Sequence, residues 1–152
     1  MKTKILMVCL GNICRSPLAE GLLKSKLDSK DFQIDSAGTG PWHVGNPPDP
    51  RSVEVANKNG LDITMQRGIQ FKPDFFDTYD HIFVMDQYNY NDVIEQARNQ
   101  HDKDKVQMIL DEIFPGERVD VPDPYNGGSN GFDNVYAMLN EATDKIAKRL
   151  QK

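Results

Sequence analysis

Cysteine and histidine are scarce in this chain. Its 152 residues include two cysteines, Cys9 and Cys14, and three histidines scattered along the sequence. Two cysteines cannot build the disulfide framework of a small secreted protein, and no cysteine–histidine cluster has the spacing of zinc ligands. We therefore expect no metal and no bound cofactor, and each cysteine requires an explanation of its own.

Long hydrophobic runs and excess positive charge are also missing. No apolar stretch approaches the roughly 20 residues that cross a bilayer, and the apolar run at residues 5–10 is too short for a signal peptide and has no cleavage site after it. The 18 basic and 23 acidic residues give a net charge of −5, which argues against sequence-independent nucleic-acid binding. We expect a cytoplasmic protein that binds no nucleic acid and inserts into no membrane. No apolar surface stripe is evident, so a monomer is expected.

Hydrophobic periodicity predicts strands that alternate with helices. Continuous apolar runs predict buried strands at residues 5–10, 81–85 and 106–110, and an alternating run predicts another at 32–37. Helices are predicted after a Ser16 cap, at 51–59, from a cap at Asp86 to about residue 100, and at 132–150, with a helical turn near 72–78. Residues 38–50 and 116–131 are predicted to be irregular. This order predicts one α/β domain over residues 1–152, with a mostly parallel sheet covered on both faces.

The loop between the first strand and the first helix carries the most informative residues. Cys9 ends the strand, and Arg15 and Ser16 stand where the helix is expected to begin. A loop of this length can direct its amides at one anion, which the helix N-terminus and a guanidinium would also bind. Gly11 permits a positive φ here, and Asn12 tolerates one better than most residues. The amides, Arg15 and the Ser16 hydroxyl would favour a nucleophilic thiolate on Cys9; the alternative is an inert core thiol.

Taken together, the motifs resemble the low-molecular-weight protein tyrosine phosphatases. They are VCLGNICRSPLAE at residues 8–20, DSAGT at 35–39, GNPPDPR at 45–51, VMD at 84–86 and DPY at 123–125. The resemblance covers nearly the whole chain. It implies a single three-layer Rossmann-like α/β domain with a four-stranded parallel sheet and a phosphate-binding loop after the first strand. It also implies hydrolysis of phosphotyrosine in a protein substrate through a cysteinyl-phosphate, without a metal.

Site residues follow from the resemblance. Cys9 would be the nucleophile, Arg15 the group that binds the transition state, and Asp123 the general acid and then the general base. The phosphate-binding loop would consist of Leu10, Gly11, Asn12, Ile13, Cys14 and Ser16. Ser36 would support Asn12 by hydrogen bonding.

Two aromatic residues and the second cysteine complete the expected site. Trp42 and Tyr125 would wall a slot that accepts an aryl ring. His43, beside Trp42, could contact the substrate, but a solvated loop is the favoured interpretation. Cys14 would form a disulfide with Cys9 on oxidation and protect it from over-oxidation, so the enzyme would be redox-sensitive; the alternative for Cys14 is a small apolar filler.

The sequence departs from the family pattern at three places. Met65 stands where many relatives have a histidine that supports the loop asparagine, so either Asn12 has another partner or the alignment is shifted. Asn126 replaces a second tyrosine of eukaryotic relatives, and the acid loop reads VPDPY where relatives often have a second acidic residue before the catalytic one.

Four other functions are considered. Protein arginine phosphatases share this fold but tend to have threonine at the position of Ile13, so phosphoarginine ranks second. Arsenate reductases need two further cysteines downstream, which this chain lacks. A decayed, non-enzymatic oxyanion-binding module is disfavoured because nucleophile, guanidinium and acid are all present. A thioredoxin-like oxidoreductase is poorly supported because four residues separate the cysteines.

Overall fold

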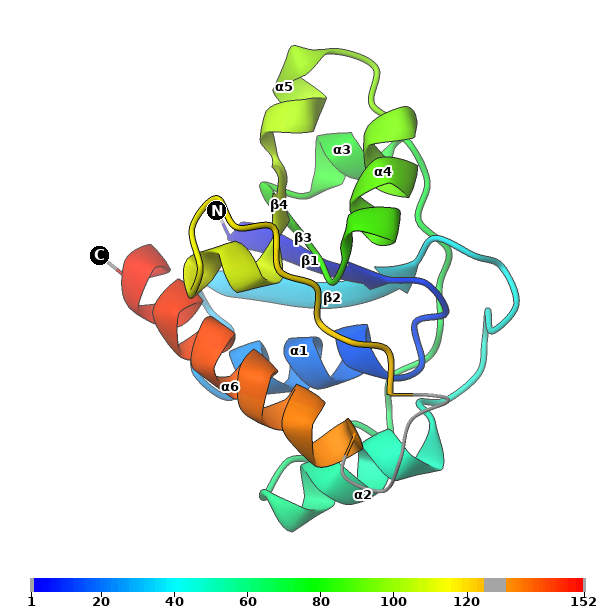
Figure 1. The fold of residues 1–152 in the computed structure, drawn as a ribbon, viewed down its shortest axis with the longest axis vertical. Coiled ribbons are helices and arrows are strands. Elements are labelled where there is room, and N and C mark those ends of the chain that lie inside the picture. The colour runs from blue at the N-terminus through cyan, green and yellow to red at the C-terminus, as the bar shows by residue number, and fades with distance from the viewer. Residues whose placement is uncertain (1, 125–130, 152) are drawn as a thin grey trace.

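Four parallel strands form the central sheet in the computed structural model, which describes residues 2–124 and 131–151 (Figure 1). The strands are β1 (Thr3–Cys9), β2 (Phe32–Gly38), β3 (His81–Val84) and β4 (Val106–Met108), in the order β2-β1-β3-β4. Each neighbouring pair is parallel. The expected four-stranded parallel sheet is confirmed.

Helices cover both faces of this sheet, because successive side chains of a strand point to opposite sides. Ile5 and Met7 of β1 pack into one apolar cluster and Leu6 and Val8 into another. On the first side lie α1 (Arg15–Lys24), α2 (Pro50–Lys58) and α6 (Gly131–Leu150), and on the second lie α3 (Phe75–Thr78), α4 (Gln87–Glu95) and α5 (Gln100–Asp104) (Figure 1). The expected three-layer arrangement is therefore confirmed.

Several element boundaries differ from the prediction. Helix α1 begins at Arg15 with no side-chain cap, because the predicted cap, Ser16, directs its hydroxyl to other partners. Helix α4 ends at Glu95, and Asn99 starts the separate helix α5 by accepting a hydrogen bond from Asp102 N. The last strand is also shorter than expected, since residues 109–112 form the 3-10 helix η1 (Ile109–Glu112).

The expected capping of the helix after the third strand is confirmed. The Asp86 side chain accepts a hydrogen bond from Asn89 N at 2.8 Å.

The loops after β1 and β2 and the start of α4 lie at the carboxyl edge of the sheet. Residues 121–124 join them there, since Val121 N donates to Met85 O at 2.8 Å. Ligands of open α/β sheets bind at this edge.

Candidate active site

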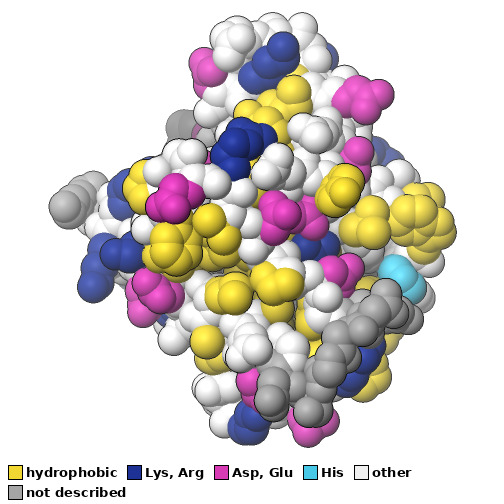
Figure 2. Space-filling model, in the orientation of Figure 1, with side chains coloured by type: hydrophobic (Ala, Val, Ile, Leu, Met, Phe, Trp, Pro, Cys, Tyr) yellow, Lys and Arg dark blue, Asp and Glu magenta, His cyan; other side chains and the backbone are white. Residues whose placement is uncertain are grey.

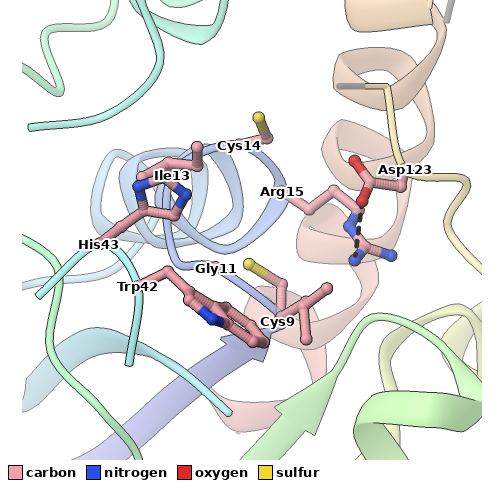
Figure 3. Close-up of a pocket in the computed structure, with 9 residues that line it drawn as sticks. Cys9, Gly11, Ile13, Cys14, Arg15, Trp42, His43 and Asp123 are labelled. Carbon is pink, nitrogen blue, oxygen red and sulfur yellow. Dashed lines mark ion pairs between the residues drawn. The ribbon is translucent and has the colours of Figure 1, made fainter. Parts of the chain in front are cut away.

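A pocket of about 200 Å³ opens at the carboxyl edge of the sheet (Figure 3). It is lined by Cys9, Leu10, Gly11, Ile13, Cys14, Arg15, Trp42, His43 and Asp123. The predicted nucleophile, guanidinium and carboxylate, which come from separate segments, thus share one cavity. Within it, the Cys9 side chain lies between Trp42 and Arg15 (Figure 3).

The loop after β1 turns at Asn12. Its φ of 57° lies in the left-handed region, which asparagine tolerates better than most residues. Gly11 does not have a positive φ, so the loop does not use the conformation that glycine permits there. The missing side chain of Gly11 instead leaves room for the His43 ring, whose Cδ2 would lie 3.1 Å from a Cβ at position 11.

Carbonyl groups of this loop are directed outward. The oxygens of Cys9 and Leu10 each accept a hydrogen bond at 2.9 Å from the backbone of residues 39 and 40, and Ile13 O accepts one from Asp49 N at 2.8 Å. Because the N–H and C=O of a peptide unit point in opposite directions, these contacts turn loop amides toward the pocket. Such a concavity of amides is suited to an oxyanion.

The Cys9 sulfur lies within reach of two hydrogen-bond donors. Asn12 N donates to Sγ at 3.2 Å, and Ser16 Oγ lies 3.0 Å from it. Since Ser16 Oγ already accepts a hydrogen bond from Asn12 Nδ2, the hydroxyl hydrogen can donate to the sulfur. Both are placed to donate to a sulfur anion, the form in which a cysteine acts as a nucleophile. Cys9 is buried, as either a nucleophile at the floor of a slot or an inert core thiol would be. The two hydrogen-bond donors at the sulfur favour the interpretation of Cys9 as a nucleophile.

A chain of buried polar groups holds Asn12 from behind. Its Nδ2 also donates to Ser36 Oγ at 2.9 Å, and Ser36 Oγ donates to Glu20 Oε1 at 2.6 Å. Its Oδ1 accepts from Ile69 N at 3.0 Å. Burial raises the pKa of Glu20, against the opposing hydrogen bonds from Lys24 and Ser36. The side-chain amide of Asn12 is therefore held by partners on three other segments, which fixes the strained turn.

Met65 takes no part in this network. Its side chain is 84% exposed, whereas Gln66 turns inward and donates from Nε2 to Pro17 O at 3.1 Å. The partners of Asn12 are the hydroxyls and the backbone amide described above. The structure therefore supports the first explanation for the missing histidine, which is that Asn12 has other partners.

Gly38 allows β2 to pack directly against the loop. A Cβ on this residue would lie 2.8 Å from Leu10 O and 3.1 Å from Asn12 N. Both atoms belong to the backbone, so any side chain at position 38 would displace the loop. The sequence placed Gly38 at a strand end without revealing this contact.

Arg15 is fixed by two acceptors. Its Nη1 donates to Asp86 Oδ2 at 2.7 Å and to Val121 O at 2.9 Å. Burial opposes the charge of Arg15, but the nearby anionic groups Cys9, Asp86 and Asp123 outweigh it and raise the guanidinium pKa. Asp86 was predicted only as a helix cap, and its second role was missed. Its place directly after a buried strand, at the ligand-binding edge, was the available signal.

Asp123 faces Arg15 across the pocket. Its Oδ2 lies 3.9 Å from Arg15 Nη2, and its side chain is 47% exposed (Figure 3). The carboxylate can therefore reach both the pocket and solvent. Tyr125 and Asn126 lie outside the described residues.

Trp42 and His43 line the pocket from the loop after β2. The indole is 65% exposed and rests on Gly40, where a Cβ would lie 1.9 Å from the ring atom Cζ3. His43 lies against Gly11 and is only partly exposed. His43 is thus partly solvated, and its place in the pocket lining also keeps contact with a substrate as a prediction.

Cys14 lines the same pocket, but its sulfur points away from Cys9 (Figure 3). Burial, with the charges of Asp49, Cys9 and Asp123, raises the pKa of the Cys14 thiol to about 12. It is therefore protonated near neutral pH. Both cysteines are free, and their pairing on oxidation remains a prediction.

Residues 2–124 and 131–151 contain neither a metal-binding cluster nor a membrane-spanning helix. No group of three or more His, Cys, Asp or Glu residues in these ranges could hold a metal ion. No helix there has the length and apolar character needed to cross a membrane.

Comparison with known proteins gives consistent matches. The family model described as "Low molecular weight phosphotyrosine protein phosphatase" matches residues 4–152. A phosphatase of that name from Schizosaccharomyces pombe is 39% identical, covering 97% of this chain and 96% of its own. A putative low molecular weight protein-tyrosine-phosphatase from Synechocystis is 41% identical, covering 98% and 97%. The crystal structure of a protein tyrosine phosphatase from Entamoeba histolytica superposes with a TM-score of 0.91 at 33% identity, covering 99% and 97%.

Proposed function

Because this chain belongs to the low-molecular-weight phosphotyrosine protein phosphatase family, a family of enzymes, we propose that it hydrolyses phosphotyrosine in proteins through a phosphoenzyme on Cys9. One observation carries the proposal. The Cys9 sulfur, with Asn12 N and Ser16 Oγ as donors, shares its pocket with Arg15 and Asp123.

The first step transfers the phosphoryl group to the enzyme. The Cys9 thiolate attacks phosphorus in line, a P–S bond forms, and the P–O bond to the tyrosine oxygen breaks. The loop amides and Arg15 bind the phosphoryl oxygens, where negative charge accumulates. Asp123 gives its proton to the departing phenolate, which leaves poorly without one because tyrosine has a pKa near 10.

The second step releases phosphate. Asp123, now ionised, accepts a proton from water as the water oxygen attacks phosphorus. The P–S bond breaks, and its electrons return to Cys9 as the thiolate. The products are inorganic phosphate and an enzyme with Asp123 protonated again. No metal takes part in either step.

An aryl phosphate suits the pocket better than an alkyl one. Ile13 and Trp42 add apolar side chains to the lining of the pocket that contains the buried Cys9. A flat aromatic ring can pack against these side chains while its phosphate reaches the sulfur, whereas the short phosphoserine side chain would hold its phosphate too far out. Phosphoarginine is long enough to reach and is the competing substrate.

A substrate comparison tests the proposed function. Purified protein should hydrolyse p-nitrophenyl phosphate and phosphotyrosine peptides, with vanadate as an inhibitor and no loss on adding a chelator. Matched peptides that carry phosphoserine or phosphoarginine should be poorer substrates, as measured by kcat/KM from released phosphate. Faster hydrolysis of phosphoarginine would shift the assignment to that substrate, and a requirement for Mg²⁺ would contradict the mechanism.

Asp86→Asn should lower kcat/KM for an aryl phosphate about ten- to hundredfold. This factor corresponds to the free energy of one charge-assisted hydrogen bond. Asp86 acts through Arg15, and an amide in its place could still cap α4 but could also turn an N–H toward Nη1. Inorganic phosphate should inhibit the variant correspondingly less well, because phosphate binding reports the position of the guanidinium.

Asp120→Asn is the matched control for this variant. Asp120 accepts a hydrogen bond from Gln87 N at the same helix terminus and is not among the partners of Arg15. Its substitution should leave kcat/KM and phosphate inhibition close to those of the parent. Equal losses in both variants would show that α4 stability, and not the position of Arg15, determines the effect.

A further inference from the structure

A second hollow borders the catalytic pocket, and we name it the α4 groove. Its volume is about 480 Å³. One side consists of Leu10 and residues 39–42, and the other of Asp92, Glu95 and Gln96 at the end of α4. Leu10 and Trp42 line both cavities. The groove therefore adjoins the pocket that would receive the phosphotyrosine.

Trp42 forms the boundary between the two cavities. Its ring is seated on the backbone of Gly40, which leaves no room for a Cβ. It remains 65% exposed, and Leu10 beside it is 41% exposed. An occupant of the groove therefore contacts a fixed aromatic ring and an apolar side chain on this side.

The opposite wall is acidic. Asp92 and Glu95 are exposed and three residues apart on α4, so they share one face of the helix and repel each other weakly. No ion pair or hydrogen bond to either carboxylate is recorded among residues 2–124 and 131–151. Figure 2 shows acidic side chains over α4 beside hydrophobic ones over the loop after β2. A cation in the groove would relieve the repulsion and contact both kinds of surface.

Given the proposed function, we infer that the α4 groove binds a lysine or arginine side chain of the protein substrate, close in sequence to the phosphotyrosine. The methylene stem would pack on Leu10 and the Trp42 ring while the charged head contacts the two carboxylates. An extended peptide advances about 3.3 Å per residue, so a residue within three positions of the phosphotyrosine can reach the neighbouring cavity. The net charge of −5 also favours basic substrate segments.

A positional peptide series tests the inference. Phosphotyrosine peptides with an otherwise neutral sequence carry one lysine or one glutamate at each of the three positions on either side. We expect the lysine peptide to have a kcat/KM about three- to tenfold above its glutamate counterpart at one or two positions, the size of effect that two exposed ion pairs can give. The difference should shrink as ionic strength rises.

Variants of α4 locate the effect. In D92N/E95Q the lysine-to-glutamate ratio should fall to about one, and in D92K/E95K it should invert. E117Q/E141Q is the matched control, because it removes the same number of negative charges from exposed residues that line neither cavity. It should keep the parental lysine-to-glutamate ratio. Hydrolysis of p-nitrophenyl phosphate, measured for every protein, normalises the peptide rates.

The outcomes separate the inference from the proposed function. Turnover of p-nitrophenyl phosphate without any lysine preference would overturn the α4 groove assignment and leave the phosphatase proposal intact. The same holds for a preference that D92N/E95Q does not change or that E117Q/E141Q also abolishes. Absence of turnover with every substrate would overturn both.

Discussion

Cys9→Ser should abolish hydrolysis of aryl phosphates, with a loss of kcat of at least about 10⁴-fold. The serine hydroxyl fits the space of the thiol but is not ionised near neutral pH, so neither Asn12 N nor Ser16 Oγ has an anion to stabilise. The nucleophile is then lost while the oxyanion-binding loop is kept. Steady-state hydrolysis of p-nitrophenyl phosphate measures the loss, and acid quenching of a single turnover tests for a phosphoenzyme that only the parent should form.

Cys14→Ser is the matched control, because it changes the other cysteine of the same loop. It should keep most of the parental activity, since Cys14 is a protonated thiol whose sulfur points away from Cys9. Urea denaturation of both variants separates lost chemistry from lost folding. Turnover by Cys9→Ser above a few per cent of the parent, or a phosphoenzyme that survives in it, would contradict the assignment of the nucleophile.

The layers of the fold were predictable because they depend on local patterns. A continuous apolar run such as residues 5–9 is typical of a strand buried on both faces. Alternation of such runs with amphipathic segments leaves few topologies other than a parallel sheet between helices. The position of Cys9, Arg15 and Ser16 after the first strand then places an anion site at the carboxyl edge. All of this follows from neighbouring residues.

Boundaries and conformations were less predictable, because one side chain can serve two purposes. Ser16 has the sequence context of a helix cap, yet its hydroxyl contacts the Cys9 sulfur and α1 starts one residue earlier. Glycine adopts positive φ more readily than any other residue. In this loop, however, Asn12 takes that conformation, and it is held by hydrogen bonds with three other segments. In both cases tertiary contacts override the local preference.

The supporting contacts of the site could not be predicted because they join distant segments. Asp86 and Arg15 are 71 residues apart and form an ion pair at 2.7 Å. The contact of Gly38 with the loop backbone likewise depends on how β2 lies beside β1. Residue types alone do not reveal such pairs, and their places at strand ends gave the only indication.

Asp123→Asn should slow the reaction about 10²- to 10⁴-fold for a leaving group as basic as tyrosine, the usual contribution of proton transfer. Asparagine keeps the size of the side chain but has no proton to donate. The loss should be smaller for p-nitrophenyl phosphate, whose leaving group departs more easily without protonation. In the parent, kcat/KM should fall on the alkaline side as the acid loses its proton, and in the variant this limb should flatten.

The leaving-group series makes this prediction specific to proton transfer. Asp123 also lies 3.9 Å from Arg15 Nη2, so its substitution could act on the guanidinium as well. A disturbed guanidinium would weaken phosphate inhibition and slow every aryl phosphate by the same factor, because it binds oxygens that all these substrates share. A missing acid slows the reaction in proportion to the basicity of the leaving group and leaves phosphate inhibition unchanged. A uniform loss across the series, with the alkaline limb retained, would therefore assign Asp123 to positioning Arg15 and require another proton donor.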